Sequence, residues 1–217
     1  MRDVPRLLLV TDRTQLADPT NLLDVIAAAV AAGAHDVLLR ERDLTPAAYA
    51  PLADQVDAIL RSVGGRLVVR DMAHATGRRG VHLRSSDPQP RRRPALLGRS
   101  VHDTGQLAAA RVAGSDYVTL SPVALSTSKP DYGPPLGPAG ISRTRAAVPG
   151  APPVLALGGV ETPLVPQLLA AGAYGIAVMG AVMRAPDPAL VVEQLLDALQ
   201  SSPPNRSIMS DLKEPRA

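Results

Sequence analysis

The chain has 217 residues, of which 46% are hydrophobic and 20% charged, and this length is sufficient for one large hydrophobic core. It contains no cysteine, which excludes disulfides and thiolate metal sites. The net charge is +3, but aromatic residues make up only 2% of the chain and neither Trp nor Phe is present to stack on bases, so we expect no nucleic-acid partner. The densest basic run, Arg91–Arg93, lies between two prolines and is typical of a solvated loop.

No apolar stretch approaches the roughly 20 residues that a membrane-spanning helix needs, so we expect no membrane partner. The charged N-terminal segment, residues 1–5, runs almost directly into a strand-like segment and leaves no room for a signal peptide. These features predict a cytoplasmic protein. The sequence leaves the oligomeric state open, and a homo-oligomer is one of the arrangements that it allows.

Short apolar runs alternate with Ala- and Leu-rich amphipathic segments along the chain. Runs of about four apolar residues suit parallel strands that are buried on both faces. In chain order, the predicted strands are Leu7–Val10, Val37–Arg40, Leu67–Arg70, Val81–Leu83, Leu97–Ser100, Tyr117–Leu120, Val154–Leu157 and Gly175–Val178.

The amphipathic segments predict helices, several of which have a proline in the first turn and a glycine after the last turn. In chain order, these helices are Asn21–Ala32, Pro46–Ser62, Gly105–Ala113, Pro138–Ala147, Pro163–Ala171 and Pro188–Leu199. The segment Arg84–Pro94 is polar and rich in proline, so the fourth helix is predicted to be short or missing.

Eight strand–helix units in about 195 residues predict an α/β protein with a single domain, a (β/α)8 TIM barrel over residues 1–200. The main alternative is a doubly wound open sheet, which normally stops at five or six strands. After Gln200 the chain becomes polar and mixed in charge, so residues 201–217 are predicted to form a disordered tail.

A TIM barrel carries its active site at the carboxyl ends of its strands, so the residues that follow the predicted strands are the candidates. Polar and charged side chains recur at these positions, which favours an enzyme that acts on a small substrate. The candidates are Thr11, Asp12, Arg40, Arg42, Asp71, Asp87, Ser100, His102, Ser126, Ser128, Lys129, Gly158, Gly159, Met179 and Gly180.

Glycines follow both of the last two predicted strands, as Gly158-Gly159 and as Gly180. In TIM barrels the loops after strands 7 and 8 often bind phosphate through backbone N–H groups. A plain tight turn is the alternative interpretation of each glycine by itself. Their occurrence after both strands favours a phosphorylated substrate.

Charged residues after strands 2 to 4 extend this interpretation. Either Arg40 or Arg42 can reach a phosphate over the barrel mouth, while an Arg–Glu surface pair with Glu41 is the alternative. Asp71 and Asp87 follow neighbouring strands and are a candidate pair of Mg2+ ligands held against a pyrophosphate. Helix capping is the alternative role for both aspartates.

The segment Ser126–Gly133 is too polar and too long for a mere connector, and we predict that it is a mobile lid. It contains Lys129, the only lysine before the C-terminal tail, as a candidate anion-binding side chain. His102 is a candidate general acid or base, or else a residue that only orients its loop.

Several stretches of the chain form a family pattern when taken in order. They are Leu8–Asp12, Leu39–Arg42, Gly80–Leu83, Gly98–His102, Ser115–Val118, Ser121–Pro122, Ser126–Pro130, Leu157–Val160 and Ala171–Val178. Over residues 7–199 the chain thereby resembles the thiamine phosphate synthase and TenI family. The resemblance implies an enzyme of thiamine biosynthesis, but it does not by itself choose between the two activities of the family.

Resemblance to the synthases implies a transferase that couples hydroxymethylpyrimidine pyrophosphate to thiazole phosphate and releases pyrophosphate. The residues that it assigns are Asp71 and Asp87 to Mg2+, Arg40, Ser100 and Lys129 to the pyrophosphate and pyrimidine, and Gly159, Met179 and Gly180 to the phosphate of the thiazole. In the catalysed step, Mg2+ and Lys129 would stabilise the departing pyrophosphate.

Two alternatives stand beside the synthase. A TenI-type tautomerase, an isomerase, binds only the thiazole phosphate, and a histidine matching His102 moves a proton. A non-catalytic regulator that binds a phosphate ligand on the same barrel is the other. Leu38, Arg70 and Arg42 stand where the synthases usually have Gln, Asn and Lys, and two of these are amides that would bind the pyrimidine. Because both carboxylates and Lys129 are present, the sequence favours the synthase.

Overall fold

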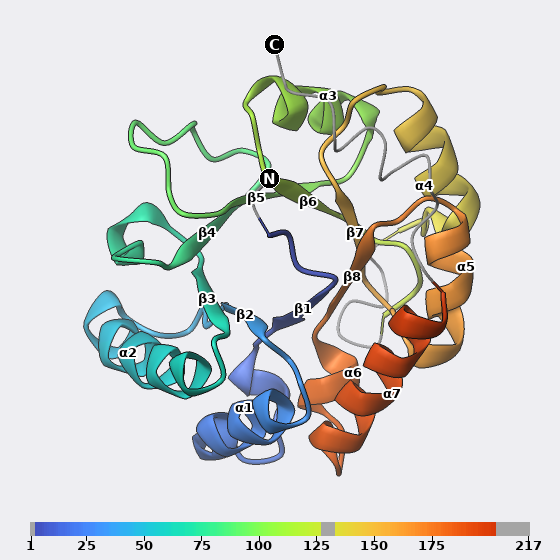
Figure 1. Cartoon of the computed structure of the whole chain (residues 1–217). Coiled ribbons are helices and arrows are strands. Elements are labelled where there is room, and N and C mark those ends of the chain that lie inside the picture. The colour runs from blue at the N-terminus through green and yellow to red at the C-terminus, as the bar shows by residue number, and fades with distance from the viewer. Residues whose placement is uncertain (1–2, 127–132, 203–217) are drawn as a thin grey trace.

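Eight parallel strands close into a barrel in sequence order, each strand pairing with the next and β8 pairing with β1 (Figure 1). The computed structural model describes residues 3–126 and 133–202. The strands are β1 (Leu7–Val10), β2 (Asp36–Leu39), β3 (Arg66–Val69), β4 (Gly80–Leu83), β5 (Leu97–Val101), β6 (Tyr117–Leu120), β7 (Val154–Leu157) and β8 (Gly175–Val178). The predicted barrel is therefore confirmed, and each predicted strand end is within one residue of the observed end.

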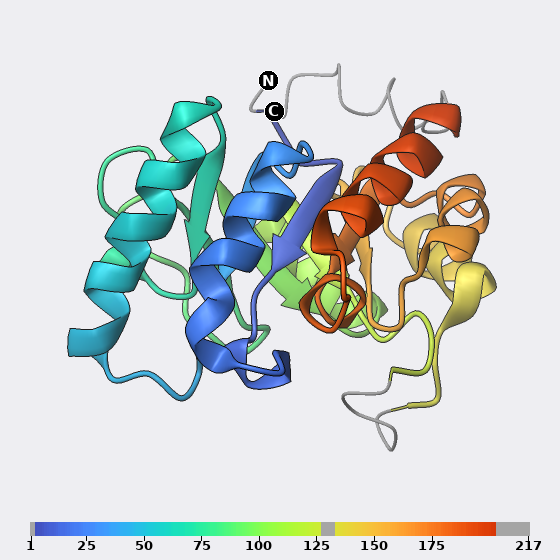
Figure 2. The same cartoon turned by 90° about the horizontal axis from the view of Figure 1, so that it is seen from below.

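Helices surround the barrel, and Figure 2 shows α1, α2 and α7 running along its outside. The α-helices are α1 (Leu22–Ala31), α2 (Pro46–Ser62), α3 (Thr104–Val112), α4 (Gly137–Ala146), α5 (Val165–Ala170), α6 (Gly180–Met183) and α7 (Pro188–Ser201). The short 3-10 helices are η1 (Arg13–Gln15), η2 (Pro19–Asn21), η3 (Met72–His74) and η4 (Thr162–Leu164). In the described part of the chain, none of the helices combines the length and apolar character needed to cross a membrane.

The ends of the helices follow from residues at their boundaries. Asp187 caps α7, because its side chain accepts a hydrogen bond from the N–H of Leu190, and a proline occupies the first turn. Gly114 and Gly172 follow α3 and α5 with φ angles of 67° and 101°, a left-handed conformation that ends a helix at little cost only for glycine. Helix α7 runs to Ser201, so the first residue of the predicted tail is helical, and residues 203–217 lie outside the described residues.

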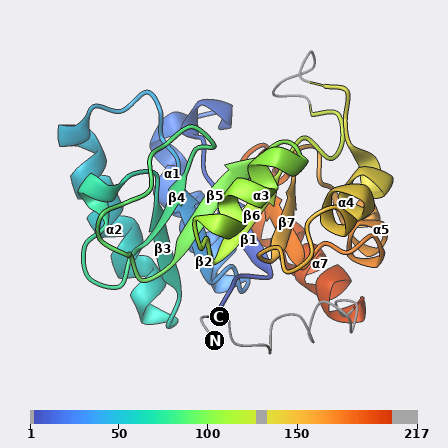
Figure 3. The same cartoon turned by 90° about the horizontal axis from the view of Figure 1, so that it is seen from above.

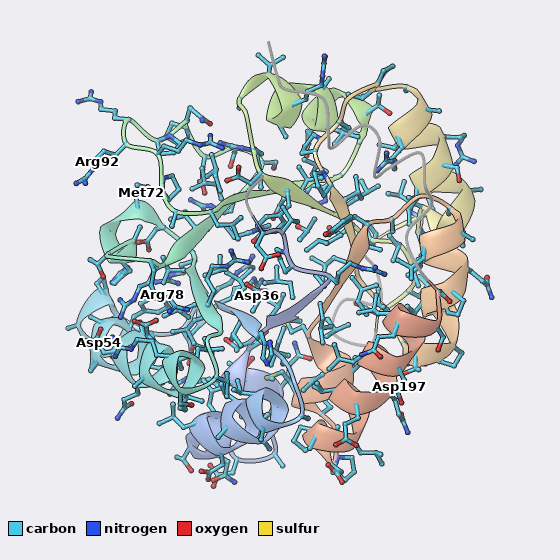
Figure 4. The ribbon with its side chains drawn as sticks, in the orientation of Figure 1. Asp36, Asp54, Met72, Arg78, Arg92 and Asp197 are labelled. Carbon is cyan, nitrogen blue, oxygen red and sulfur yellow. The ribbon has the colours of Figure 1, made fainter. Side chains whose placement is uncertain are left out.

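The predicted loss of the fourth helix is confirmed, because residues 84–96 join β4 to β5 without a helix. Arg92, from the run expected to be solvated, points away from the barrel on this loop (Figure 4), whereas Arg93 of the same run forms an ion pair with Asp116 at 2.7 Å. Figure 3 shows α3, the next helix, in front of β5 and β6. The connection between β3 and β4 also lacks an α-helix and carries only η3, whereas a regular eightfold alternation would place one there.

The core has two layers, because successive residues of each strand face opposite sides of the sheet. On β1, Leu8 and Val10 face the barrel interior, while Leu7 and Leu9 belong to the layer between strands and helices. The buried interior residues are Leu8, Val10, Leu38, Val68, Leu96, Tyr117, Leu155 and Ala177. Side chains fill the barrel, so the substrate site is restricted to its ends.

A polar cluster interrupts this apolar interior between β4, β5 and β6. The Nδ1 atom of His82 lies 3.1 Å from the hydroxyl of Tyr117, and its Nε2 atom lies 3.0 Å from Ser100 Oγ and 3.2 Å from Thr119 Oγ1. A β-carbon at Gly98 would overlap both the Tyr117 ring and the imidazole. Glycine at this position therefore makes room for the cluster.

Replacing Gly98 with alanine should destabilise the fold, because the added methyl group forces the rings of Tyr117 and His82 out of a packed interior. We expect the free energy of unfolding to fall by about 1–3 kcal/mol in urea denaturation. Gly105→Ala is the matched control, since Gly105 is exposed in the first turn of α3. A Gly98→Ala variant as stable as this control would contradict the packing argument.

Burial, together with the positive charges of Arg99 and Arg40, lowers the pKa of His82 to about 3. The unfolded chain binds a proton below the ordinary pKa of about 6.5 while the folded chain does not, so this histidine reduces stability as the pH falls. In His82→Gln, the loss of unfolding free energy between about pH 7 and pH 5 should be smaller than in the wild type by about 2 kcal/mol. Urea denaturation at both pH values tests this, and equal losses would show that His82 is protonated in the folded state.

Candidate active site

The segments that follow the eight strands all lie at one end of the barrel, because the strands are parallel (Figure 2). Strand-end residues line two of the cavities in the described part of the chain. One cavity lies at the ends of β7 and β8, and the other lies beside β5, where the fourth helix is missing. Ser128 and Lys129, and with them most of the predicted lid, lie outside the described residues.

The cavity at β7 and β8, called here the glycine cavity, has a volume of about 90 Å³. The structure brings five of the predicted site residues together in its lining, and they come from the ends of three strands. These residues are Ser126, Gly158, Gly159, Met179 and Gly180. Gly158, Gly159 and Gly180 are separated in the sequence but thus lie together at a single site.

The conformation of Gly158 and Gly159 explains why both are glycines. Their φ angles are 97° and 63°, in the left-handed region. A β-carbon on Gly159 would overlap the carbonyl oxygen of Leu125, and the N–H of Ala124 donates to the carbonyl of Gly158 at 2.9 Å. The alternative of a tight turn is therefore also correct, since these glycines let the loop after β6 pack on the loop after β7. This packing forms one wall of the glycine cavity.

The second cavity has a volume of about 230 Å³ and is lined by polar side chains that include Asp87, Arg99, Ser100 and Gln106. Arg99 is buried, with 6% of its surface exposed, and its Nη1 atom donates to the backbone carbonyls of Arg84 at 3.0 Å and of Asp87 at 2.7 Å. This side chain does part of what the missing helix would do, because it ties the loop after β4 to β5.

Asp87 forms its contacts within its own loop. Its carboxylate accepts hydrogen bonds from the backbone N–H of Arg84 at 2.8 Å and from the Nε of the same residue at 2.9 Å. Burial by itself would raise the pKa of Asp87, but the hydrogen bonds and charge of Arg84 outweigh it and lower the pKa. The carboxylate is therefore ionised at neutral pH.

Asp71 caps η3, as the alternative interpretation of this residue states. Its Oδ1 atom accepts from the N–H of Ala73 at 3.0 Å and lies 2.8 Å from Nδ1 of His74. Its Oδ2 atom lies 3.7 Å from Nε of Arg70, and 42% of the Asp71 side chain is exposed. One oxygen atom thus remains accessible for a ligand.

These two aspartates fit Mg2+ in donor type, although both also stabilise their own loops. Among the described residues, no three His, Asp or Glu side chains converge as a complete metal cage. Mg2+ usually takes only one or two carboxylates, with water and substrate phosphates as its other ligands. Binding to Asp87 requires Arg84 to release it, and the Arg84 side chain is 78% exposed and can move away without unpacking the core.

Arg40 and Arg42 occupy different environments after β2. Arg40 is half-buried and points toward β1, with its Nη1 3.7 Å from Oδ2 of Asp12, whereas Arg42 is exposed. Burial and the charge of Arg42 lower the pKa of Arg40. The alternative of an Arg–Glu surface pair is wrong, because Glu41 is fully buried and accepts hydrogen bonds from Thr11 Oγ1 and from the N–H of Arg13.

The two residues that replace amides of the family are also engaged elsewhere. Leu38 is 4% exposed and belongs to the apolar barrel interior. The guanidinium of Arg70 donates to the carbonyl of Glu41 at 2.8 Å and lies 5.0 Å from the ring centre of Tyr49, a buried residue of α2. Neither side chain supplies the amide that the family pattern places there.

His102 links the ends of β5 and β6. Its Nδ1 lies 2.9 Å from the carbonyl oxygen of Ser121, and because a carbonyl only accepts, this nitrogen carries the proton. Its backbone N–H donates to Oε1 of Gln106 at 3.0 Å. His102 lines neither of the two cavities, so these contacts match the orienting role better than the acid–base role.

The sequence interpretation missed Arg184, whose side chain also lines the glycine cavity. Its Nη1 donates to Oε1 of Gln15, a residue of η1 that is distant in sequence. One signal was available, because Arg184 follows Gly180 by four residues, which is one helical turn. The strand-end rule did not reach it, since α6 is too short to give a periodic pattern.

Comparison with known proteins agrees with this architecture. A family model described as thiamine monophosphate synthase matches residues 7–182. The chain is 37% identical to a thiamine-phosphate synthase of Methanoregula boonei, over 80% of this chain and 84% of that protein. It is 35% identical to one of Salinispora tropica, over 92% of this chain and 99% of that protein.

A solved structure of thiamine phosphate pyrophosphorylase from Pyrococcus furiosus has the same fold. It superposes with a TM-score of 0.78 at 22% identity and covers 91% of this chain and 96% of that chain. The family model and the full-length relatives together show that this chain belongs to the thiamine monophosphate synthase family.

Proposed function

We propose that the protein is a thiamine-phosphate synthase, which couples hydroxymethylpyrimidine pyrophosphate to thiazole phosphate and releases pyrophosphate. The observation that carries this proposal is the match to relatives of that name along almost their whole length. The proposal places the enzyme in the cytoplasm and gives it two small phosphorylated substrates.

The glycine cavity at the ends of β7 and β8 supports a site for one of these substrates. The glycine cavity suits the phosphate of the thiazole, through backbone N–H groups near Gly159 and Gly180. Ser100 and Asp87, which we assign to the pyrophosphate and its metal, both line the second cavity, which lies beside β5 and also contacts Ala109 and Ala113 at α3. Ser126 lines the glycine cavity and precedes Ser128 and Lys129 in the sequence, so we assign this loop to substrate binding.

The coupling breaks a carbon–oxygen bond and forms a carbon–nitrogen bond. Loss of pyrophosphate leaves a cation on the methylene carbon of the pyrimidine, and the ring nitrogen of the thiazole donates its electron pair to that carbon. No proton has to be moved. The task of the chain is therefore to stabilise the departing negative charge, to align the thiazole nitrogen and to exclude water, which would otherwise capture the cation.

Lys129, Arg40 and Ser100 carry the first of these tasks in the proposal. Lys129 and Arg40 supply positive charge to the leaving pyrophosphate, and Ser100 supplies a hydroxyl whose position His82 fixes. Arg42 is exposed at the rim, where it can serve the arriving anion. Mg2+, held by Asp71 and Asp87, supplies further positive charge to the pyrophosphate when it is bound.

The tautomerase remains the second candidate because Leu38 and Arg70 leave the pyrimidine without its expected amides. The deciding experiment is a coupling assay on the purified protein, with both substrates, with and without Mg2+, detecting thiamine phosphate. Product that depends on Mg2+ supports the synthase. Absence of product with turnover of the thiazole phosphate favours the tautomerase, and binding of the phosphate ligand without any turnover favours the regulator.

Asp87→Asn should lower the coupling rate about 100-fold or more at limiting Mg2+, because an amide is a poorer ligand for the ion than a carboxylate. The defect should become smaller as the Mg2+ concentration rises. Asp197→Asn is the matched control, since Asp197 is exposed on α7, on the outside of the barrel (Figure 4). A defect that does not respond to Mg2+ would assign Asp87 to holding its loop alone.

Lys129→Ala and His102→Ala separate the two enzymatic candidates. In a synthase, removing Lys129 should reduce coupling by about 100- to 1,000-fold, because one positive charge on the departing anion is lost. His102→Ala should have a smaller effect on coupling, since its contacts orient a loop. In a tautomerase the order reverses, so measuring both reactions on both variants decides between the candidates. Equal and small effects of both substitutions would refute both assignments.

A further inference from the structure

Arg184 is the one cation among the described residues that line the glycine cavity. Glu161 also lines this cavity, so the lining without Arg184 would carry a net negative charge and would repel a phosphate. The backbone N–H groups of glycines carry only partial charges. A site for a phosphate dianion at this position therefore depends on a full positive charge that the glycines do not supply.

The guanidinium of Arg184 lies over Gly180. A β-carbon at Gly180 would overlap Nη1 and would lie 2.6 Å from Nη2. Glycine at this position thus lets the guanidinium approach the backbone of the residue that begins α6. The result is a charged group directly beside the amides of the proposed phosphate site.

Gln15 holds this guanidinium in place from the neighbouring strand end, because β1, which precedes Gln15, pairs with β8. Its Oε1 accepts a hydrogen bond from Nη1 of Arg184. Its Nε2 donates to Oδ2 of Asp12 at 3.1 Å and lies 3.7 Å from the sulfur of Met179. Asp12 and Gln15 both come from the segment after β1, so this segment orients Arg184, a side chain that follows β8.

Among the described residues, no carboxylate neutralises the charge of Arg184. In residues 3–126 and 133–202, its hydrogen-bond partner is a neutral amide and it takes part in no ion pair. Because Gln15 uses only Nη1, the edge formed by Nε and Nη2 remains to bind an anion. This edge presents two parallel N–H donors, a geometry that matches two oxygens of a phosphate.

We propose that Arg184, oriented by Gln15, binds the phosphate of the thiazole substrate and makes the site select the phosphorylated thiazole over its free alcohol. This inference rests on the proposed function and extends it to Arg184, a residue that does not directly follow a strand. The interaction adds a charge-assisted contact to those of the glycine backbone. Gln15 is a positioning residue, because it acts through Arg184.

Equilibrium binding tests this inference independently of turnover. Isothermal titration of the full chain with thiazole phosphate, without the pyrimidine substrate, should show a dissociation constant about 10- to 100-fold higher for Arg184→Ala than for the wild type. The free thiazole alcohol should bind wild type and variant within about twofold of each other, because it lacks the group that Arg184 contacts. Gln15→Leu should show a smaller loss, again confined to the phosphorylated ligand.

Two further variants control for charge and for folding. Arg92→Ala removes an exposed arginine from the loop between β4 and β5 and should leave binding unchanged (Figure 4). Arg184→Lys keeps the charge but loses the paired donors, so it should recover part of the affinity. Unchanged binding of thiazole phosphate by Arg184→Ala, or equal losses for the phosphate and the alcohol, would overturn the inference.

The same samples distinguish failure of this inference from failure of the proposed synthase activity. Phosphate-selective binding that depends on Arg184, with no thiamine phosphate formed after addition of the second substrate and Mg2+, would refute the synthase and support the binding role. Conversely, coupling activity together with a thiazole phosphate affinity that does not depend on Arg184 would support the synthase and refute the binding role of Arg184. A wild-type chain that binds neither thiazole phosphate nor inorganic phosphate would overturn both.

Discussion

Closure of the sheet between β8 and β1 is the constraint on which the rest of the molecule depends. The N–H of Ile176 donates to the carbonyl of Arg6 at 2.8 Å, and Leu7, Leu8 and Leu9 pair with three successive residues of β8. A β-carbon at Gly175 would overlap the backbone of Arg6, so the first residue of β8 has to be glycine for the two strands to meet. Closure leaves no sheet edge and brings the carboxyl ends of all eight strands to one end of the barrel. Polar residues that are dispersed along the chain thereby come to the same end of the barrel.

Most side chains of the candidate active site also have a structural task, and this combination limits how they can act. Asp71 caps η3, Asp87 binds the loop in which it lies, and Gly158 and Gly159 let two loops pack together. Such contacts fix the groups before a substrate arrives, and fixed dipoles and charges stabilise a departing anion without reorganisation. Asp87 is the exception, because it exchanges Arg84 for any metal that it binds. The exposed, unpacked Arg84 makes that exchange inexpensive in free energy.

The sequence allowed the barrel to be predicted almost completely, because short runs buried on both faces and prolines and glycines at helix ends are local signals. Prediction from the sequence failed for very short elements and for contacts between residues that are far apart in the chain. Helix α6 has four residues, fewer than a periodic pattern needs, and η3 replaces a helix where no apolar face exists. In the site, the residues after each strand were predictable from topology. Their partners were not, because contacts such as Arg70 with Glu41 join residues far apart in sequence and depend on side-chain directions.

At the ends of β2 and β5, packing of the barrel interior limits which side chains can contact the proposed pyrimidine. The side chain of Leu38 packs in the barrel interior with Val10 and Val68, so it cannot turn aside to let a neighbouring polar group take its place. The Ser100 hydroxyl is one of the polar groups that the interior does offer at this end, and the buried, neutral imidazole of His82 holds it in place. In the proposed synthase, recognition of the pyrimidine would therefore rely on a hydroxyl and on shape more than on paired amides. In the proposed synthase, the phosphate and pyrophosphate groups would then carry most of the binding energy, through charged side chains such as Arg40 and Arg184.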